Sequence, residues 1–181
     1  VDWWSNDAEP NGIEFIFRTT NTNNHQTLIR SSGSVAGEDH WDLRIIPFGS
    51  STTTGSIQFR LNNSENASSV IASNAISMST DNINDINNNK FINVFLQRDK
   101  VTSSFAVTQS YHMFIGRKDG DKIKNIQHIS MSSFNTHANQ NFITSSGQSN
   151  NNLLFGEEIT GSIGEIRAWD AYISMSKFKQ H

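Results

Sequence analysis

The stretch Leu153-Leu-Phe-Gly-Glu-Glu-Ile-Thr-Gly-Ser-Ile-Gly-Glu-Ile-Arg-Ala-Trp-Asp170 decides the fold of this chain of 181 residues. A short apolar strand ends at Gly156, a polar turn follows, and a second strand runs from Gly161 to Trp169. Ser174 then suits a helix N-cap, because its hydroxyl can accept a hydrogen bond from a backbone N–H of the first turn. We therefore expect a strand, a turn, a strand that closes the fold, and a short helix at this end of the chain.

Upstream of this stretch, apolar residues alternate with polar ones in short runs separated by turn residues. This period of two is typical of strands that bury one face, and runs of this kind at short spacing indicate an all-β domain. Two packed antiparallel sheets bury roughly ten to twelve such strands. The expected strands cover Gly12–Arg18, Gln26–Arg30, Trp41–Ile46, Ser56–Leu61, Lys90–Asp99, Tyr111–Ile115 and Ile123–Ile129, with less regular candidates at Val70–Ala72, Ala75–Met78 and Phe105–Val107.

Turn and loop signals separate these strands. Lys118-Asp-Gly-Asp-Lys122 contains an Asp-Gly pair, which is a strong short-range signal for a hairpin. The low-complexity run Asp81–Asn89 and the polar segment Ser130–Asn152 are expected to be loops.

Composition excludes several classes of protein. Lys and Arg number 14 against 17 Asp and Glu, with a net charge of −3, so a nucleic-acid partner is not expected. The chain has no cysteine, which excludes disulfides and thiolate metal sites, and no apolar run approaches membrane-spanning length. The chain begins at Val1 and ends at His181 just after the expected helix, which suggests one domain, 1–181, that belongs to a longer chain.

The order of these signals resembles the concanavalin A-like lectin/glucanase jelly roll, and within it the laminin-G-like and pentraxin-like modules. Phe91 stands where the central strand of that family usually has a tryptophan. The matching segments are Gly12–Thr19, Gln26–Arg30, Trp41–Ile45, Gly55–Phe59, Lys90–Leu96 and the closing Gly161–Asp170. The resemblance implies an all-β, two-sheet antiparallel jelly-roll sandwich with a short C-terminal helix.

The resemblance implies a fold more than a function, because this fold hosts lectins, hydrolases, adhesion modules and structural virion domains. Our first hypothesis is a non-catalytic binding or adhesion module that recognises glycans or a protein surface through its loops or its concave sheet. The alternative is a structural domain of a larger assembly, such as a virion, a phage tail or a secreted multidomain protein, in contact with neighbouring subunits. Both hypotheses place the domain outside the cell or on a virion surface.

A glycoside hydrolase is the third hypothesis. Glycosidases of this fold carry a Glu-x-Asp-x-x-Glu pattern, whose spacing puts the carboxylates on one face of a strand. That pattern is absent: Glu157 and Glu158 are adjacent in a turn, and Glu165 is followed at alternate positions by Arg167 and Trp169. The sequence therefore predicts no enzyme of this kind.

Four residues are candidates for contacting a ligand. Trp3, Trp4 and Trp41 have large rings that stack on a sugar when they are exposed, although the pattern favours Trp3 and Trp4 covering an edge of the sandwich. His112, in the expected strand Tyr111–Ile115, is the fourth, with an ordinary surface histidine as the alternative.

Four aspartates are candidates for binding metal. Asp119 and Asp121 flank the glycine of the hairpin turn, and Asp81 and Asp85 lie in the Asn-rich loop. Carboxylate oxygens are calcium ligands, but the spacing does not match the helix–loop–helix calcium motif, and turn chemistry also explains the first pair. Calcium is the one cofactor that the sequence leaves open.

Overall fold

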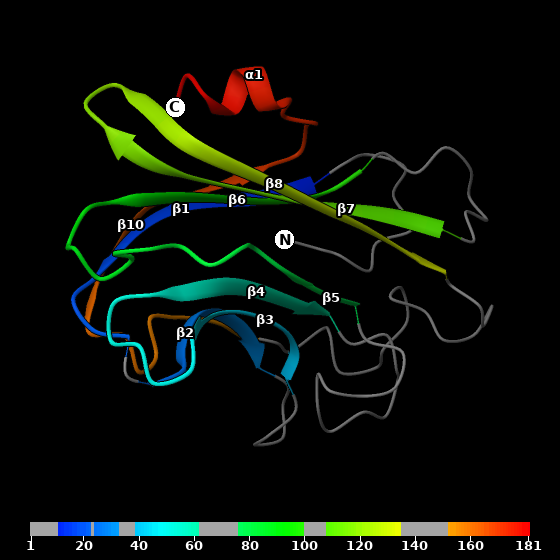
Figure 1. Ribbon diagram of the computed structural model, residues 1–181. Coiled ribbons are helices and arrows are strands. Elements are labelled where there is room, and N and C mark those ends of the chain that lie inside the picture. The colour runs from blue at the N-terminus through cyan, green and yellow to red at the C-terminus, as the bar shows by residue number, and fades with distance from the viewer. Residues whose placement is uncertain (1–10, 23, 33–38, 62–75, 100–107, 135–151) are drawn as a thin grey trace.

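The structure is a computed structural model and describes residues 11–22, 24–32, 39–61, 76–99, 108–134 and 152–181. These residues form ten strands in two antiparallel sheets and one short helix, which confirms the expected jelly-roll sandwich (Figure 1). Among them, no helix has the length and apolar character needed to cross a membrane. Trp3 and Trp4, and the strand candidates Val70–Ala72 and Phe105–Val107, lie outside the described residues.

The first sheet has the strand order β10-β1-β6-β7-β8 and forms the upper layer of Figure 1. Every neighbouring pair in it is antiparallel. Its strands are β1 (Asn11–Thr19), β6 (Ile92–Arg98), β7 (Thr108–Asp119), β8 (Lys122–Phe134) and β10 (Gly161–Trp169).

The second sheet has the order β5-β4-β3-β2-β9 and forms the lower layer. It is also antiparallel throughout. Its strands are β2 (Gln26–Ser32), β3 (Asp39–Pro47), β4 (Gly55–Leu61), β5 (Ile76–Ser79) and β9 (Asn152–Phe155).

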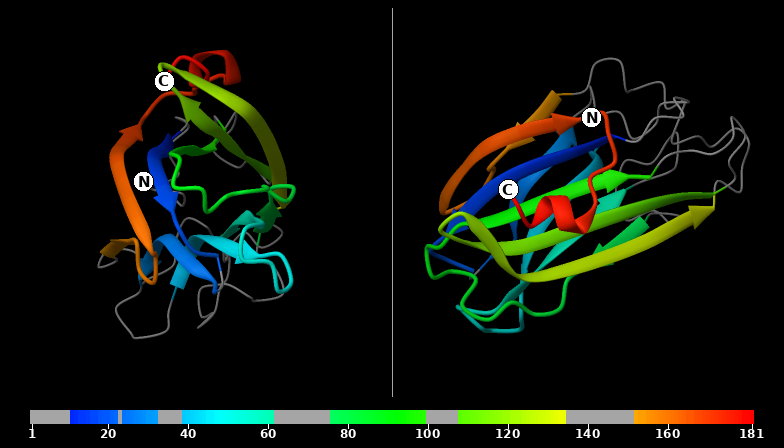
Figure 2. Two further views of the ribbon diagram at one scale, coloured as in Figure 1. Left: turned by 60° about the vertical axis from the view of Figure 1, so that its left-hand side comes forward. Right: turned by 90° about the horizontal axis from the view of Figure 1, so that it is seen from above.

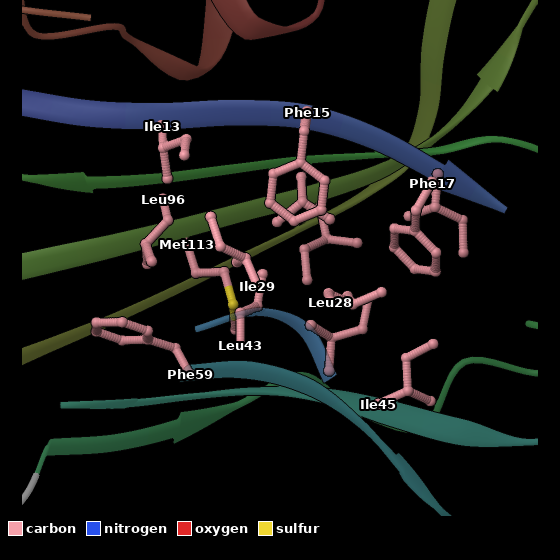
Figure 3. Close-up of a cluster of buried hydrophobic side chains, with 14 of the residues drawn as sticks. Ile13, Phe15, Phe17, Leu28, Ile29, Leu43, Ile45, Phe59, Leu96 and Met113 are labelled. Atoms are coloured by element: carbon pink, nitrogen blue, oxygen red, sulfur yellow. The ribbon is translucent and has the colours of Figure 1, made fainter. Parts of the chain in front are cut away.

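The main core lies between the two sheets and is built from the alternating apolar residues that the sequence indicated. Phe15 and Phe17 of β1 point down toward Leu28 and Ile45 of the second sheet (Figure 3). Trp41 belongs to this core, is fully buried and packs against Phe59 at 6.2 Å between ring centroids. The prediction that Trp41 contacts a ligand is therefore wrong, because alternation along β3 turns its ring toward the opposite sheet.

A second, smaller cluster covers the outer face of the first sheet. Helix α1 (Met175–Phe178) lies above this sheet in Figures 1 and 2, and its Phe178 packs against Phe95 and Phe114 at 6.4 and 5.7 Å between centroids. This cover explains why β6 is buried along its whole length, as its apolar residues on both faces indicated. As expected, Ser174 caps the helix, and its hydroxyl accepts a hydrogen bond from the Lys177 N–H.

The closing stretch of the sequence links the two sheets. β9 pairs with β2 in the second sheet, and after the turn at Gly156 the chain crosses to the first sheet, where β10 pairs with β1. The prediction that Gly161–Trp169 closes the fold is therefore confirmed, since this strand forms the edge of the first sheet next to β1.

The β7–β8 hairpin is longer than the sequence indicated. The Asp-Gly turn is in place, with Gly120 at φ +62°, but pairing extends from Thr108 to Asp119 and from Lys122 to Phe134. The segment expected to be a polar loop from Ser130 onward thus begins as strand. Backbone pairing with β7 stabilises these serine-rich residues as strand despite their low strand propensity.

The ion pair of Glu157 with Arg30 gives a modest prediction about acid stability. The hydrogen bond from Arg30 holds the pKa of Glu157 below its ordinary value, and the two side chains are 40% and 25% exposed. Because this pKa is lowered on folding, the pair stabilises the protein above a pH of about 4 and loses its effect as pH falls further. Glu157→Gln should cost at most about 1 kcal/mol in urea unfolding at pH 7. The difference from the parent protein should shrink at pH 3, and a difference that grows there would contradict this account.

Candidate binding cleft

The loop of residues 80–90, which follows β5, is anchored by its two isoleucines. Ile86 is fully buried and Ile83 packs against the core. The Ile86 N–H donates a hydrogen bond to the Thr53 carbonyl at 3.0 Å, and the Ile83 N–H donates to the Gly55 carbonyl at 2.7 Å. The segment runs between the two layers toward β6 (Figure 1). The apolar side chains point inward, which leaves the intervening Asn and Asp residues on the outside of an ordered loop.

A bulge in β8 faces this loop. Ile115 pairs with Gln127 and Arg117 with Lys124, so Gly116 stands opposite two residues of β8 instead of one. Asn125, one of these two residues, has a left-handed φ of +52°. The bulge needs Gly116, because a Cβ at this position would lie 2.1 Å from Cγ2 of Ile123.

The loop and the hairpin meet around a cleft of about 310 Å³. Two hydrogen bonds connect its walls: the Asp81 N–H donates to Oε1 of Gln127 at 2.9 Å, and the Arg117 guanidinium donates to the Asn84 carbonyl. The cleft is lined by Asn82, Ile83, Asn84, Asp85, Ile92, Ile115, Gly116, Arg117, Asn125 and Gln127.

A second hollow of about 440 Å³ adjoins the cleft and shares Arg117 and Asn125 with it. It adds one aromatic ring, that of Phe91. The Arg18 guanidinium lies over this ring, 5.2 Å from its centroid. Its other lining residues are mostly basic: Lys90, Lys118 and Lys124, together with Asn89 and Asp119. The two hollows together form one polar groove, which is positive where Lys90, Lys118 and Lys124 line it.

The chemistry of the groove suits a ligand that carries many hydroxyl groups. Four side-chain amides, those of Asn82, Asn84, Asn125 and Gln127, each offer both a donor and an acceptor. Three isoleucines supply an apolar surface beside the amides. The volume of the cleft lies at the lower end of the range for small-molecule sites. A sugar ring has the same combination of hydroxyl groups and apolar C–H faces.

The metal candidates fall into two places. Asp119, at the hairpin end, forms an ion pair with Lys124, and the hydrogen bond from this lysine holds the pKa of Asp119 below its ordinary value. The described partner of this carboxylate is thus an ammonium group. Asp85 lines the cleft, and Asp81 contributes its backbone N–H to the bridge. Across the described ranges, no group of three or more His, Asp or Glu side chains is arranged to hold a metal ion. Calcium binding by the four aspartates therefore stays a prediction.

His112 lies away from the cleft, on the outer face of the first sheet, where it contacts His128, Asp99 and Tyr172. Sequence reasoning selected Asp81 and Asp85 near the cleft but missed Asn82, Asn125 and Arg117. One signal in the sequence could have indicated the bulge beside Asn125. Gly116 is an isolated glycine in an otherwise regular strand, and such a glycine often marks a bulge.

No family model matches the chain, and no curated protein matches it in sequence. Among solved structures it is similar to the botulinum neurotoxin serotype C1 binding domain, at 16% identity and a TM-score of 0.46, over 94% of this chain and 35% of that chain. It is also similar to the CBM40 of the Ruminococcus gnavus IT-sialidase bound to α2,3-sialyllactose, at 13% identity and a TM-score of 0.44, over 95% and 81%. A third similar structure is the alginate lyase from Alteromonas sp. 272, at 9% identity and a TM-score of 0.36, over 87% and 73%. The chain spans 35% of the toxin chain's length, and likeness this distant assigns it neither a ligand nor an activity.

Proposed function

We propose that this chain is a non-catalytic binding module that takes a glycan in the groove between the loop of residues 80–90 and the β7–β8 hairpin. The observation that carries the proposal is the lining of the cleft, where four amides and a guanidinium surround an apolar floor of three isoleucines. Amides suit neighbouring hydroxyl groups because each can donate to one and accept from another.

The scaffold holds this lining in place before a ligand arrives. The isoleucine anchors fix the loop, the bulge at Gly116 fixes Asn125, and the Gln127–Asp81 hydrogen bond ties the two walls together. A site that is ordered before binding loses less conformational entropy when the ligand enters.

The number and placement of carboxylates in the groove favour a binding function over a hydrolytic one. Glycosidases need two carboxyl groups that face one scissile bond. Of the described lining residues, the cleft contributes only Asp85 and the adjoining hollow only Asp119, whose carboxylate is paired with Lys124.

A glycan array covering neutral and acidic oligosaccharides tests the proposal, with calorimetry on the glycan that binds best. The double variant Asn82→Ala, Asn125→Gly removes two cleft amides, and glycine is chosen at 125 because it tolerates the left-handed φ of +52°. Each lost hydrogen bond is worth about 0.5–1.5 kcal/mol, so the loss of two should lower the affinity about 5- to 150-fold.

Asn24→Ala is the matched control, because Asn24 is an exposed amide that does not line the groove. It should bind like the parent protein. A folded protein that binds nothing on the array, or binding that the double variant leaves unchanged, would refute the proposal. Hydrolysis products in the calorimetry cell would favour the enzyme alternative.

The same proposal has three further parts. The chain lies outside the cell, it is one of the laminin-G-like or pentraxin-like modules, and residues 1–181 form a single domain. The competing proposal is a structural domain within an assembly such as a virion, with neighbouring subunits on its surface. Phe48, Ile166 and Tyr172 are 57%, 49% and 47% exposed, but Phe48 follows a strand of the second sheet and Ile166 lies in the first, and single exposed apolar residues need no partner to explain them. Native mass spectrometry separates the two, since a monomer that binds glycans contradicts the assembly proposal.

A further inference from the structure

Two histidines meet on the outer face of the first sheet, away from the groove. His112 lies on β7 and His128 on β8, and the register pairs Phe114 with His128 and His112 with Ser130, so the histidines are diagonal neighbours. Nδ1 of His112 lies 3.0 Å from Nε2 of His128, and the ring centroids are 5.3 Å apart. The two rings therefore approach each other through their nitrogen atoms.

A carboxylate lies on the far side of His112. Oδ2 of Asp99, directly after β6, is 3.4 Å from Nε2 of His112. This contact favours the tautomer with the proton on Nε2, which leaves the lone pair of Nδ1 facing His128. Histidines that bind metal almost always donate their other ring N–H to such a carboxylate or a similar acceptor.

Aromatic neighbours set the orientation of the pair. Phe114 lies against His128 with ring centroids 4.4 Å apart, and the edge of Tyr172 meets His112 at 6.2 Å. Phe114 is itself fixed in the cluster under helix α1 through Phe95 and Phe178. His128 is exposed, so an ion in solution can reach its ring.

We propose that His112 Nδ1 and His128 Nε2 bind one divalent d-block cation, such as Cu²⁺, Ni²⁺ or Zn²⁺, and that Asp99 positions His112 for this role. Metal–imidazole bonds of about 2.0–2.1 Å place two adjacent ligand nitrogens about 3 Å apart. The distance between His112 Nδ1 and His128 Nε2 is 3.0 Å, which matches this value. Imidazole suits these ions, whereas Ca²⁺ and Mg²⁺ prefer oxygen ligands. With two ligands from the protein, the other coordination positions are open to water or to a group from outside.

Calorimetry with the untagged chain tests the site, since a histidine tag would bind the same ions. CuCl₂, NiCl₂ and ZnCl₂ should each show one saturable site, with Cu²⁺ bound most tightly, and CaCl₂ should show none. The electron paramagnetic resonance spectrum of the Cu²⁺ form should show two nitrogen donors. His112→Ala and His128→Ala should each weaken binding at least about tenfold.

His25→Ala is the control, because His25 is an exposed loop histidine, and it should bind like the parent protein. Asp99→Asn should lower the affinity about 10- to 100-fold while keeping one site and two nitrogen donors. Circular dichroism checks the fold of each variant, and the exposed His128 offers a substitution that leaves the core intact. Absence of saturable binding, or binding that survives both histidine substitutions, would overturn the proposal. Since the groove is elsewhere, this result is independent of glycan binding.

Discussion

Glu14→Gln is expected to lower the free energy of unfolding by about 3 kcal/mol, because each hydrogen bond to a charged group contributes about 1.5–3 kcal/mol. Glu14 of β1 is a carboxylate with 1% exposure on the outer face of the first sheet. Its oxygens accept hydrogen bonds from Asn93 Nδ2 at 3.0 Å and Trp169 Nε1 at 3.1 Å, and His181 Nδ1 lies 2.8 Å away. Arg167 adds a charge at 3.7 Å.

Glutamine keeps the shape of this side chain but turns one acceptor into a donor. At least one of the surrounding N–H groups then faces another N–H, which is costly because the side chain at position 14 is buried and its own N–H cannot reach water. Urea unfolding followed by tryptophan fluorescence measures the loss. Glu157→Gln removes the same charge at an exposed pair and should cost at most about 1 kcal/mol. Equal losses in the two variants would show that the burial of Glu14 has no energetic consequence.

Gly161→Ala is expected to lower the free energy of unfolding by about 1–3 kcal/mol through overpacking. Gly161 begins β10 and pairs with Thr19 of β1. A Cβ at Gly161 would lie 1.9 Å from the Arg18 carbonyl oxygen and 3.0 Å from Cα of Thr19. These are backbone atoms of the neighbouring strand, so the clash is relieved only if the two strands separate at this end of the ladder.

Gly164→Ala is the matched control on the same strand. A Cβ at Gly164 meets no atom within 4 Å, and its φ is not in the left-handed region, so this change should stay within about 0.5 kcal/mol of the parent protein. Guanidinium unfolding of the two variants makes the comparison. If Gly164→Ala destabilises as much as Gly161→Ala, the cause is the loss of glycine in general and the close approach to Arg18 is not responsible.

The fold was largely predictable because its signals are local. Alternation of apolar residues in segments such as Gly12–Arg18 and Trp41–Ile46 depends only on which face of a strand is buried, and the Asp-Gly turn depends only on backbone preference. The end of β8 was missed because strand pairing with β7, rather than its own residues, stabilises Ser130–Phe134.

The candidate sites were less predictable because their residues are distant in sequence. Asn82 and Asn125 share a cleft only because the loop of residues 80–90 passes the bulge in β8. The same holds for His112 and His128, which are 16 residues apart and meet across two strands. Trp41 shows the opposite case, in which a residue type suited to ligand binding is taken up by the core.

The closing stretch, Leu153–Asp170, shows both what local sequence determines and what only tertiary structure decides. Its sequence alone determined a strand, a turn, a strand and a capped helix, since these follow from side-chain periodicity and from hydrogen bonds within a few residues. Tertiary structure decided that β10 lies beside β1, that Gly161 touches Arg18, and that Trp169 covers Glu14. These contacts join residues more than 140 positions apart, and their energies depend on burial, which no local pattern in the sequence specifies.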